Sequence, residues 1–273
     1  MSDADKPLNK KDQKRLDEKR GEGMGKDYVP FIKVGEFSSS GESVRVKSAT
    51  VGRVHHLHSG NELAAFLVFD WCKEVIDIRE QFPIPLADSL IICRQLGIRH
   101  PQEKSELTIV TTDFLINFAD GSQLAIPVKP ALKLDDRRIV EKLQIEKAYW
   151  EALKVPCPIF TDQEVANDLK MNLKWLKPLI DIDTEVEYPF SKQDVIDLAA
   201  RLAKQPKAYV ARHCAKLDDH YQLREGTHIE VFRYGIANQY LKASLEIQFT
   251  EWKCEDVELL IRSDTDLEVG NAS

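Results

Sequence analysis

Residues 111–129 read TTDFLINFADGSQLAIPVK, a pattern that is typical of a β-hairpin. The run 107–118 is rich in β-branched and aromatic residues, and the pair Asp120-Gly121 that follows it marks a tight turn. The run 123–128 is then the returning strand. The sequence therefore predicts two antiparallel strands joined by a short loop.

The length of that loop decides which side chains share a face of the hairpin. With a three-residue loop, 119–121, and Gly121 at positive φ, Asp113 lies opposite Pro127, and Lys129 lies diagonally on the same face. With a two-residue loop, Asp113 and Lys129 lie on opposite faces. A site that uses Asp113 together with Lys129 therefore requires the three-residue loop.

A carboxylate beside a lysine at the end of a strand suits metal-dependent hydrolysis of a phosphodiester. The carboxylate holds Mg²⁺ through oxygen, and the metal polarises the phosphate and activates a water. The lysine orients or deprotonates that water, or neutralises the developing charge. One carboxylate is too few, and Glu62, at the start of an expected helix, is the candidate for the second.

Each of these residues also has an ordinary interpretation. Ser59-x-x-Glu62 is a helix capping box in its own right. An acid followed at a distance by a lysine occurs by chance in many proteins, so the spacing of Asp113 and Lys129 alone does not decide between a site and two surface residues.

The segments around the hairpin alternate between strands and helices. The sequence predicts short strands within 28–58, a helix over 59–71, a strand over 75–82, a helix over 86–96, a long amphipathic helix over 135–153 and a short buried strand over 156–160. Thr161-x-x-Glu164 is a capping box that starts a further helix. This order indicates a mixed α/β sheet covered by helices.

The last third of the chain is expected to be mainly helical. Ser191-x-x-Asp194 and Thr227-x-x-Glu230 each read as a capping box that begins a helix, and another helix covers 206–217. The run 240–249 has the pattern of a strand. Three short helices followed by a strand or hairpin suggest a winged-helix arrangement.

These patterns divide the chain into four parts. Residues 1–26 are polar and charged and end in three glycines, which predicts a flexible N-terminal arm. Residues 27–178 form the α/β domain, 179–190 form an acidic linker, and 191–273 form the smaller, winged-helix-like domain.

The composition is that of a globular protein. The 273 residues are 43% hydrophobic and 30% charged, unlike a coiled coil or a disordered chain. No apolar stretch approaches the roughly 18 residues of a membrane span, and the charged N-terminus lacks the apolar core of a signal peptide. Five cysteines without a C-x-x-C spacing favour neither a zinc ribbon nor a disulfide framework. We therefore expect a protein of the reducing cytosol.

The net charge of -7 is unevenly distributed. Residues 1–180 hold 27 basic and 27 acidic side chains, whereas residues 181–273 hold 11 basic and 18 acidic ones. Since contact with phosphate is largely electrostatic, an acidic domain is a poor binder of DNA and a better candidate for binding a protein. The last third is therefore expected to face a protein partner.

One stretch of the first half is locally basic. Between positions 41 and 60 the only acid is Glu42, and three histidines, His55, His56 and His58, lie among the basic residues. The candidates for contact with DNA phosphates are Arg45, Lys47, Arg53 and His56. A solvated pair of strands explains the same stretch, and the histidines are expected at the surface or facing phosphate instead of binding a metal.

Several separated motifs occur in order over residues 20–175. They are GKDYVP at 25–30, GRVHHL at 52–57, Ser59-x-x-Glu62, VIDIREQFP at 75–83, TDF at 112–114, VKP at 128–130 and IFTD at 159–162. Together they resemble the TnsA family, the endonuclease subunits of the two-part transposases of Tn-seven-type transposons. The last third is similar to this family only in length and in its helix pattern.

The resemblance implies a fold and a catalytic site. The N-terminal domain is expected to have the fold of type II restriction endonucleases, with Glu62, Asp113 and Lys129 as its active site. Mg²⁺, for which Mn²⁺ is expected to substitute, would be held by the two carboxylates and the backbone carbonyl of Val128. The family cuts the non-transferred strands at the 5′ ends of the element.

The resemblance also implies partners. A DDE-type transposase, TnsB, cuts and joins the 3′ ends, and the AAA+ regulator TnsC is contacted through the C-terminal domain. The location is then the bacterial cytosol, at the nucleoid, with no membrane partner.

The sequence departs from the family pattern at one position of the site. The family has an acid or glutamine two residues before the lysine, and Pro127 stands there instead. Water or DNA phosphate would then hold a second metal, or Glu146 on the long helix would substitute, or the enzyme would be weak without its partners. A proline is also expected at the end or edge of a strand ladder, because it has no backbone N–H to donate.

Pro127 keeps other functions open. A non-catalytic assembly subunit would bridge the transposase and its AAA+ regulator without cutting DNA. Another nuclease of the same fold, such as a restriction enzyme or a junction resolvase, would cut DNA without partners.

Overall fold

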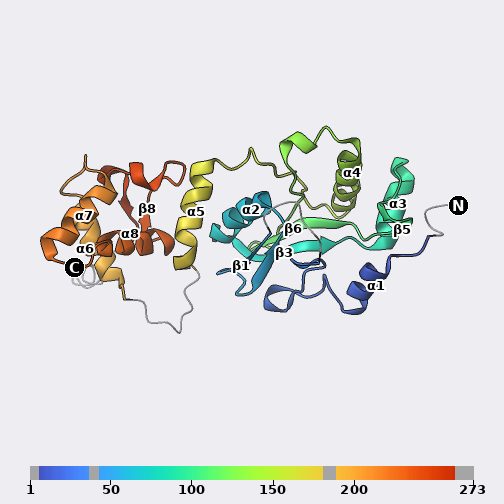
Figure 1. Ribbon diagram of the computed structural model, residues 1–273, viewed down its shortest axis with the longest axis horizontal. Helices are drawn as coiled ribbons and strands as arrows, with labels where there is room; N and C mark the ends of the chain where they lie inside the picture. The colour runs from blue at the N-terminus through green and yellow to red at the C-terminus, as the bar shows by residue number, and fades with distance from the viewer. Residues whose placement is uncertain (1–5, 37–42, 181–188, 262–273) are drawn as a thin grey trace, which may run out of the picture. The chain divides into compact units, whose positions relative to one another are not determined.

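The computed structural model describes residues 6–36, 43–180 and 189–261. The chain forms two compact units, Met1–Val165 and Ala166–Ser273, which are treated one at a time below (Figure 1). No helix in the described part of the chain is long and apolar enough to cross a membrane.

The N-terminal unit is built around a three-stranded antiparallel sheet. Its strands are β3 (Val75–Pro83), β6 (Thr111–Phe118) and β7 (Gln123–Ile126), in the order β3-β6-β7. The central strand β6 is buried along most of its length, since it pairs on both sides and carries apolar residues on both faces. The mixed α/β organisation that the sequence predicted is therefore confirmed.

The hairpin between β6 and β7 has the three-residue loop that the site requires. Phe118 N–H donates to the Ser122 carbonyl at 3.0 Å, and Gly121 has φ +85°. The pairing of Phe114 with Ile126 continues this register, so Asp113 lies opposite Pro127.

Pro127 lies just beyond the end of β7, where the absence of a backbone N–H removes no hydrogen bond from the strand pairing. Strand β7 ends at Ile126, one residue before Pro127, and the Pro127 carbonyl accepts from Phe160 N–H at 2.8 Å. Val128 and Phe160 then form a parallel bridge. The expectation of a ladder end for Pro127 is confirmed, and the segment 156–160 lies alongside the hairpin as a bridge, not as a full strand.

Three helices and a small hairpin surround the sheet. The helices are α2 (Gly60–Trp71), α3 (Leu86–Leu96) and α4 (Arg137–Ala152), and the hairpin pairs β1 (Val44–Lys47) with β2 (Val54–Leu57). Short elements complete the unit: η2 (Gly25–Asp27), β4 (Gln102–Glu103), β5 (Glu106–Leu107) and η3 (Ala131–Lys133). Two apolar clusters fix α4: Ile145 packs with Ile84, Ile92, Cys93 and Val110, and Trp150 packs with Leu115 and Ala125.

The prediction of a flexible arm over residues 1–26 is wrong for the part that the structure describes. Helix α1 (Lys10–Asp17) is tied to the unit by its buried Asp12, which accepts from Ile109 N–H at 2.8 Å and from Arg15 at 2.6 Å. Just before it, Leu8 bridges Leu107 in parallel. The sequence signal was misleading because the polar residues of this segment pair with one another and with the backbone of the unit.

The C-terminal unit is mainly helical. It contains α5 (Asn167–Ile180), α6 (Lys192–Leu202), α7 (Val210–Tyr221) and α8 (Thr227–Ala237), with the two-stranded ribbon of β8 (Leu241–Lys242) and β9 (Glu258–Leu259). The turns η4 (Phe249–Glu251) and η5 (Cys254–Asp256) lie between the two strands. The helices are followed by this ribbon, in which β8 is much shorter than the strand expected over 240–249. The winged-helix arrangement stays a prediction.

The boundary between the units differs from the sequence prediction. We expected the first domain to end at residue 178, which assigned most of α5 to it. Instead α5 belongs to the second unit: Trp175 stacks on Phe249 with ring centroids 4.4 Å apart, and Asn172 donates to the Leu245 and Ile247 carbonyls. Most of the linker predicted over 179–190 lies outside the described residues.

Two of the expected helix starts are also corrected. Thr161 and Glu164 do hydrogen-bond as in a capping box, but α5 begins only at Asn167. Thr227 makes no cap, because the Asp218 carboxylate from α7 accepts from Gly226 N–H and His228 N–H at the start of α8. The capping box at Ser191 and Asp194 is confirmed.

Candidate active site

Asp113 is held in place on β6 by hydrogen bonds to both of its carboxylate oxygens. Oδ2 accepts from Val128 N–H at 2.6 Å and from Lys129 Nζ at 2.7 Å, while Oδ1 accepts from Gln81 Nε2 at 3.1 Å. The structure thus brings Asp113 and Lys129 together, as the three-residue loop predicted.

Gln81 is a site residue that sequence reasoning missed. It lies within β3 at φ +50°, a left-handed conformation that non-glycine residues rarely adopt, and it is only 5% exposed. Its Oε1 accepts from Thr111, so the amide orientation is fixed and its nitrogen faces Asp113. Strain of this kind persists only where the surroundings enforce it, and no local sequence pattern marks it.

Lys129 bridges two oxygens of the site. Its Nζ donates to Asp113 Oδ2 and to the Val128 carbonyl, each at 2.7 Å. Burial acts to lower the pKa of Lys129, but the charges of Asp113 and Glu146 outweigh it and raise that pKa well above its usual value. Lys129 therefore stays cationic, and its ammonium contacts two oxygens of the type that bind hard cations.

Glu62 lies in the first turn of α2 and has two roles. Its backbone N–H donates to Ser59 Oγ at 3.1 Å, which caps the helix, while its side chain accepts from His58 N–H and from Ser59 Oγ. Burial and the negative charge of Asp113 raise the pKa of Glu62 to about 7. The capping interpretation is correct, and the capped carboxylate also interacts electrostatically with Asp113 and Lys129.

Glu146 joins the same group of charges from helix α4. It is 3% exposed, and its Oε2 has no hydrogen-bond partner. Burial, together with the charge of Asp113, raises the pKa of Glu146 to about 8, although Lys129 acts in the opposite direction. One turn later, Trp150 Nε1 donates to Thr112 Oγ1 at 2.8 Å and fixes this face of α4 against β6.

The charges of this site fit a divalent cation. Three buried or nearly buried carboxylates, those of Glu62, Asp113 and Glu146, interact with the cation of Lys129, and Lys142 also interacts with Glu146. Two of the three carboxylates have raised pKa values. Among the described residues no three His, Cys, Asp or Glu side chains stand close enough to form a metal site by themselves. Backbone oxygen, water or phosphate would have to complete the coordination.

The prediction that Arg53 contacts DNA is wrong. Its side chain is 9% exposed and donates to both carboxylate oxygens of the fully buried Glu80, at 2.9 and 2.5 Å. His55 Nδ1 also contacts Glu80, and His55 is fully buried, not at the surface. Burial acts to raise the pKa of Glu80, but the hydrogen bonds from His55 and Arg53 hold it at about 2.

The other candidates for DNA contact differ in exposure. His56 is partly buried, burial lowers its pKa, and its Nδ1 accepts from Val34 N–H at 3.1 Å, so it is a poor phosphate ligand. Arg45 and Lys47 are exposed on β1. The basic stretch therefore serves mainly to build the unit around Glu80, and only these two exposed side chains remain candidates.

The sequence is similar to known proteins in both units. Residues 72–162 match the family described as TnsA-like endonuclease N terminal, and residues 164–245 match the family described as TnsA endonuclease C terminal. The chain is also 39% identical over 246 residues, 89% of each chain, to the transposon Tn7 transposition protein TnsA of Escherichia coli.

The chain belongs to the TnsA family. It is therefore an endonuclease subunit of a transposase, and its N-terminal unit has a restriction-endonuclease-like fold. The two family matches meet at residues 162–164, close to the division between the units at Val165. The first match includes Asp113, Lys129 and Glu146, whereas Glu62 lies before it.

Proposed function

We propose that this TnsA-family chain is a Mg²⁺-dependent DNA endonuclease that cuts the non-transferred strands at the 5′ ends of a transposon. The observation that carries the proposal is the group of Glu62, Asp113 and Glu146 around Lys129, in which three buried or nearly buried carboxylates outnumber the two lysines that interact with them, Lys129 and Lys142. A divalent cation restores that balance, and oxygen ligands are those that Mg²⁺ prefers.

In this proposal each residue has a distinct role. Glu62, Asp113 and the Val128 carbonyl hold the metal, for which Mn²⁺ can substitute. When bound, the metal polarises the scissile phosphate and lowers the pKa of the attacking water. Gln81 fixes the direction of the Asp113 carboxylate through its 3.1 Å hydrogen bond.

Lys129 acts as a permanent cation. Because nearby carboxylates raise its pKa, it holds its proton at neutral pH and is suited to stabilise negative charge on the phosphate rather than to remove a proton from water. A metal held by the Val128 carbonyl would compete with Lys129 for that oxygen, to which Nζ donates at 2.7 Å, and would leave the ammonium to face the phosphate.

Glu146 takes the place that Pro127 leaves empty. The position two residues before the lysine has no ligating side chain, while Glu146 Oε2 is buried and without a partner. Glu146 therefore supplies the additional carboxylate from the facing helix, either to a metal directly or to a water that the metal holds.

The test is strand-specific cleavage in the assembled system. Purified chain would be incubated with Mg²⁺, ATP, a TnsB-like transposase, a TnsC-like regulator and end-labelled transposon-end DNA, alongside Asp113→Ala. We expect cuts at the 5′ ends with the wild type and a loss of at least about 10²-fold with the variant. The chain without partners is expected to leave plasmid DNA intact, since independent cutting would favour a restriction enzyme or resolvase.

The rival function is a non-catalytic assembly subunit, which Pro127 favours. If wild type and Asp113→Ala both give only 3′-strand cuts, while a chain truncated before the second unit abolishes them, the adaptor function is correct and hydrolysis by this chain is not.

A further inference from the structure

Gln81 is the residue of β3 that lies opposite Asp113 in the pairing of β3 with β6. The register is set by the two flanking pairs, Glu80 with Phe114 and Phe82 with Thr112. Side chains that lie opposite each other in such a pair are close neighbours. Gln81 nevertheless has a φ of +50°, which departs from the extended conformation of a strand. The backbone at Gln81 therefore decides where its amide stands relative to Asp113.

The Gln81 amide is held at both ends by side chains of β6. Its Oε1 accepts from Thr111 Oγ1, and its Nε2 donates to Asp113 Oδ1, each at 3.1 Å. The other carboxylate oxygen, Oδ2, accepts from Val128 N–H and from Lys129. With donors on both oxygens the Asp113 carboxylate has a fixed orientation, in which Oδ1 carries one donor and keeps a lone pair for a cation.

The left-handed conformation of Gln81 depends on the peptide that joins it to Glu80. The carbonyl of this peptide accepts from the Tyr28 hydroxyl at 3.0 Å. Because the peptide is planar, its orientation sets ψ of Glu80 and φ of Gln81 together. A strained φ persists only where the surroundings enforce it. The Tyr28 hydroxyl thus holds the peptide in the orientation that Gln81 requires.

The side chain of Glu80 is anchored separately, at the β1–β2 hairpin. Arg53 donates to both carboxylate oxygens, His56 N–H donates to Oε1 at 3.0 Å, and His55 Nδ1 lies 2.8 Å from Oε2. Glu80 is fully buried. Since its side chain is fixed, the peptide on its C-terminal side is the part that the Tyr28 hydroxyl controls.

Tyr28 is well placed to donate this hydrogen bond. It is 3% exposed, and the guanidinium carbon of Arg53 lies 5.1 Å from the centroid of its ring. Burial, together with the charge of Glu80, raises the pKa of Tyr28 far above its usual value, so the hydroxyl keeps its proton. None of the roles assigned above to the residues of the site uses this buried hydroxyl.

We propose that Tyr28 is a positioning residue for DNA cleavage, which acts on Asp113 through the Glu80–Gln81 peptide and the Gln81 amide. The inference rests on the proposed function and adds a residue to it. Without the hydroxyl the peptide can turn, Gln81 relaxes toward an extended conformation, and its Nε2 leaves Asp113. The carboxylate is then held through Oδ2 alone and loses its fixed orientation toward a metal.

A purely structural role for Tyr28 leads to a different result. If its hydrogen bond only stabilised the unit, its loss would lower the free energy of unfolding and leave the folded site unchanged. If it positions Asp113, its loss weakens metal binding by the folded chain. Partners that orient a metal ligand typically contribute about 10- to 100-fold to metal affinity or activity.

The test first measures metal binding without cleavage. Full-length wild type, Tyr28→Phe and Gln81→Asn would be titrated with Mn²⁺ well below their unfolding temperatures, and free Mn²⁺ would be followed by electron paramagnetic resonance. Only binding that is lost in Asp113→Ala is assigned to the site. Tyr28→Phe is expected to bind Mn²⁺ at least about tenfold more weakly than the wild type. Thermal unfolding in EDTA reports the stability of each variant separately.

Gln81→Asn tests the same route at its next step. Asparagine adopts the left-handed conformation more readily than most residues, so the fold should be retained. Its amide is one methylene shorter and does not reach Asp113, so the same loss of Mn²⁺ affinity is expected. In the assembled cleavage system both variants should cut more slowly at limiting Mg²⁺ and recover part of the rate at saturating Mg²⁺.

The matched control is Tyr149→Phe. It removes one hydroxyl from a partly buried tyrosine of the same unit, whose ring packs on Trp150 with centroids 5.0 Å apart. Mn²⁺ affinity and cleavage should stay close to those of the wild type. An equal loss in this control would overturn the proposal.

The remaining outcomes separate this inference from the proposed function. Wild-type Mn²⁺ affinity and cleavage in Tyr28→Phe, whatever its stability, would refute the positioning role and leave the nuclease function intact. A loss in Tyr28→Phe without one in Gln81→Asn would refute the route through Gln81. If the wild type itself neither binds Mn²⁺ at this site nor cuts 5′ ends, the proposed function is wrong, and the inference is wrong with it.

Discussion

The lysine of the site contacts the same oxygens that a metal would use. Lys129 Nζ lies 2.7 Å from both Asp113 Oδ2 and the Val128 carbonyl. The lysines do not balance the carboxylates of this site: Glu62 and Glu146 are buried near Asp113 and both have raised pKa values, although Lys129 acts to lower both and Lys142 acts to lower that of Glu146. The metal-free site therefore takes up protons in place of a divalent cation.

This charge balance predicts how stability depends on pH. With the pKa of Glu62 at about 7 and that of Glu146 at about 8, the folded metal-free chain keeps protons that the unfolded chain loses near pH 4 to 5. The unfolded state then binds fewer protons, so the free energy of unfolding should fall as the pH rises from about 5 to 8. Thermal unfolding in EDTA checks this, and a shift of ~3 °C or more is expected.

The same pH series, repeated with Mg²⁺, tests whether the site binds a divalent cation. Divalent cations need deprotonated carboxylates, so the stabilisation by Mg²⁺ should grow over this pH range. Glu62→Gln/Glu146→Gln should flatten the pH dependence and remove most of the Mg²⁺ effect, whereas Glu103→Gln, an exposed control on β4, should do neither. A pH dependence that survives in the double variant would show that these two carboxylates are not its source.

At the scale of the element, the β6–β7 hairpin carries the geometry of the site. A change of one residue in its loop would move every later side chain of β7 to the other face. Deleting Ala119 should therefore separate Lys129 from Asp113 and abolish cleavage.

The substitution Gly121→Ala is the matched comparison. A Cβ atom added at Gly121 has no neighbouring atom within 4 Å, so the only cost is that alanine must adopt a φ of +85°. It should cost about 1 kcal/mol of stability and leave cleavage intact.

Cleavage in the assembled system and urea unfolding of both variants would check this prediction. If the deletion variant cut DNA normally, the site would not depend on the register that the hairpin sets. Loss of cleavage in Gly121→Ala, with the fold retained, would contradict the assignment of a purely conformational role to the glycine.

Some elements could be predicted from the sequence because their causes are local. The turn at Gly121, the alternation of β6 and the cap at Ser59 each depend on residues a few positions apart, so counting placed Asp113 beside Lys129, as the structure has them. The role of Glu62 with these two residues in one catalytic site stays a prediction. Gln81 could not be found in this way, because its conformation is imposed by packing against Asp113 and Thr111. The cap of α8 could not be predicted either, because the carboxylate that accepts from its first N–H groups belongs to Asp218, on the preceding helix.

Hydrogen bonds between residues far apart in the sequence also explain why the positions of some charged residues were predicted wrongly. Arg53 and Asp12 both look like surface residues in a polar segment, yet each is buried against a partner more than 25 positions away: Glu80 for Arg53, and the Ile109 backbone for Asp12. Charge patterns show how many ions a segment holds but not which of them are neutralised on folding. Of the four residues proposed for contact with DNA, Arg45 and Lys47 are exposed, as expected.

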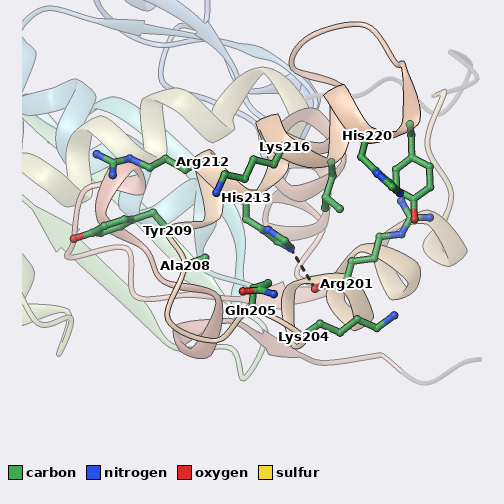
Figure 2. A pocket seen from close by; sticks show the side chains of 11 residues that line it. Arg201, Lys204, Gln205, Ala208, Tyr209, Arg212, His213, Lys216 and His220 are labelled. Carbon is green, nitrogen blue, oxygen red and sulfur yellow. Dashed lines mark hydrogen bonds between the residues drawn. The ribbon is translucent and has the colours of Figure 1, made fainter.

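At the scale of the whole molecule, the two units differ in the charged side chains that they carry. The N-terminal unit contains the carboxylates and the lysine, within a stretch of zero net charge, residues 1–180. In the described part of the C-terminal unit, Arg212 and Lys216 lie one turn apart on α7 (Figure 2) and form no ion pair. Because residues 1–180 carry no net charge, this part of the chain is expected to have little affinity of its own for DNA.

The boundary between the units gives a final prediction. A fragment ending at Val165 keeps the whole of the first unit and should be folded, monomeric and stabilised by Mg²⁺, but inactive on transposon ends. A fragment ending at residue 178 adds most of α5, whose Leu173 and Leu176 are buried at 2% and 0% exposed in the second unit. Without that unit these two side chains would be exposed to water, and each would lose about 2 kcal/mol of favourable free energy from hydrophobic burial. The longer fragment should therefore aggregate on size-exclusion chromatography. A longer fragment that stayed monomeric and was the more stable of the two would place α5 with the catalytic unit and contradict the division at Val165.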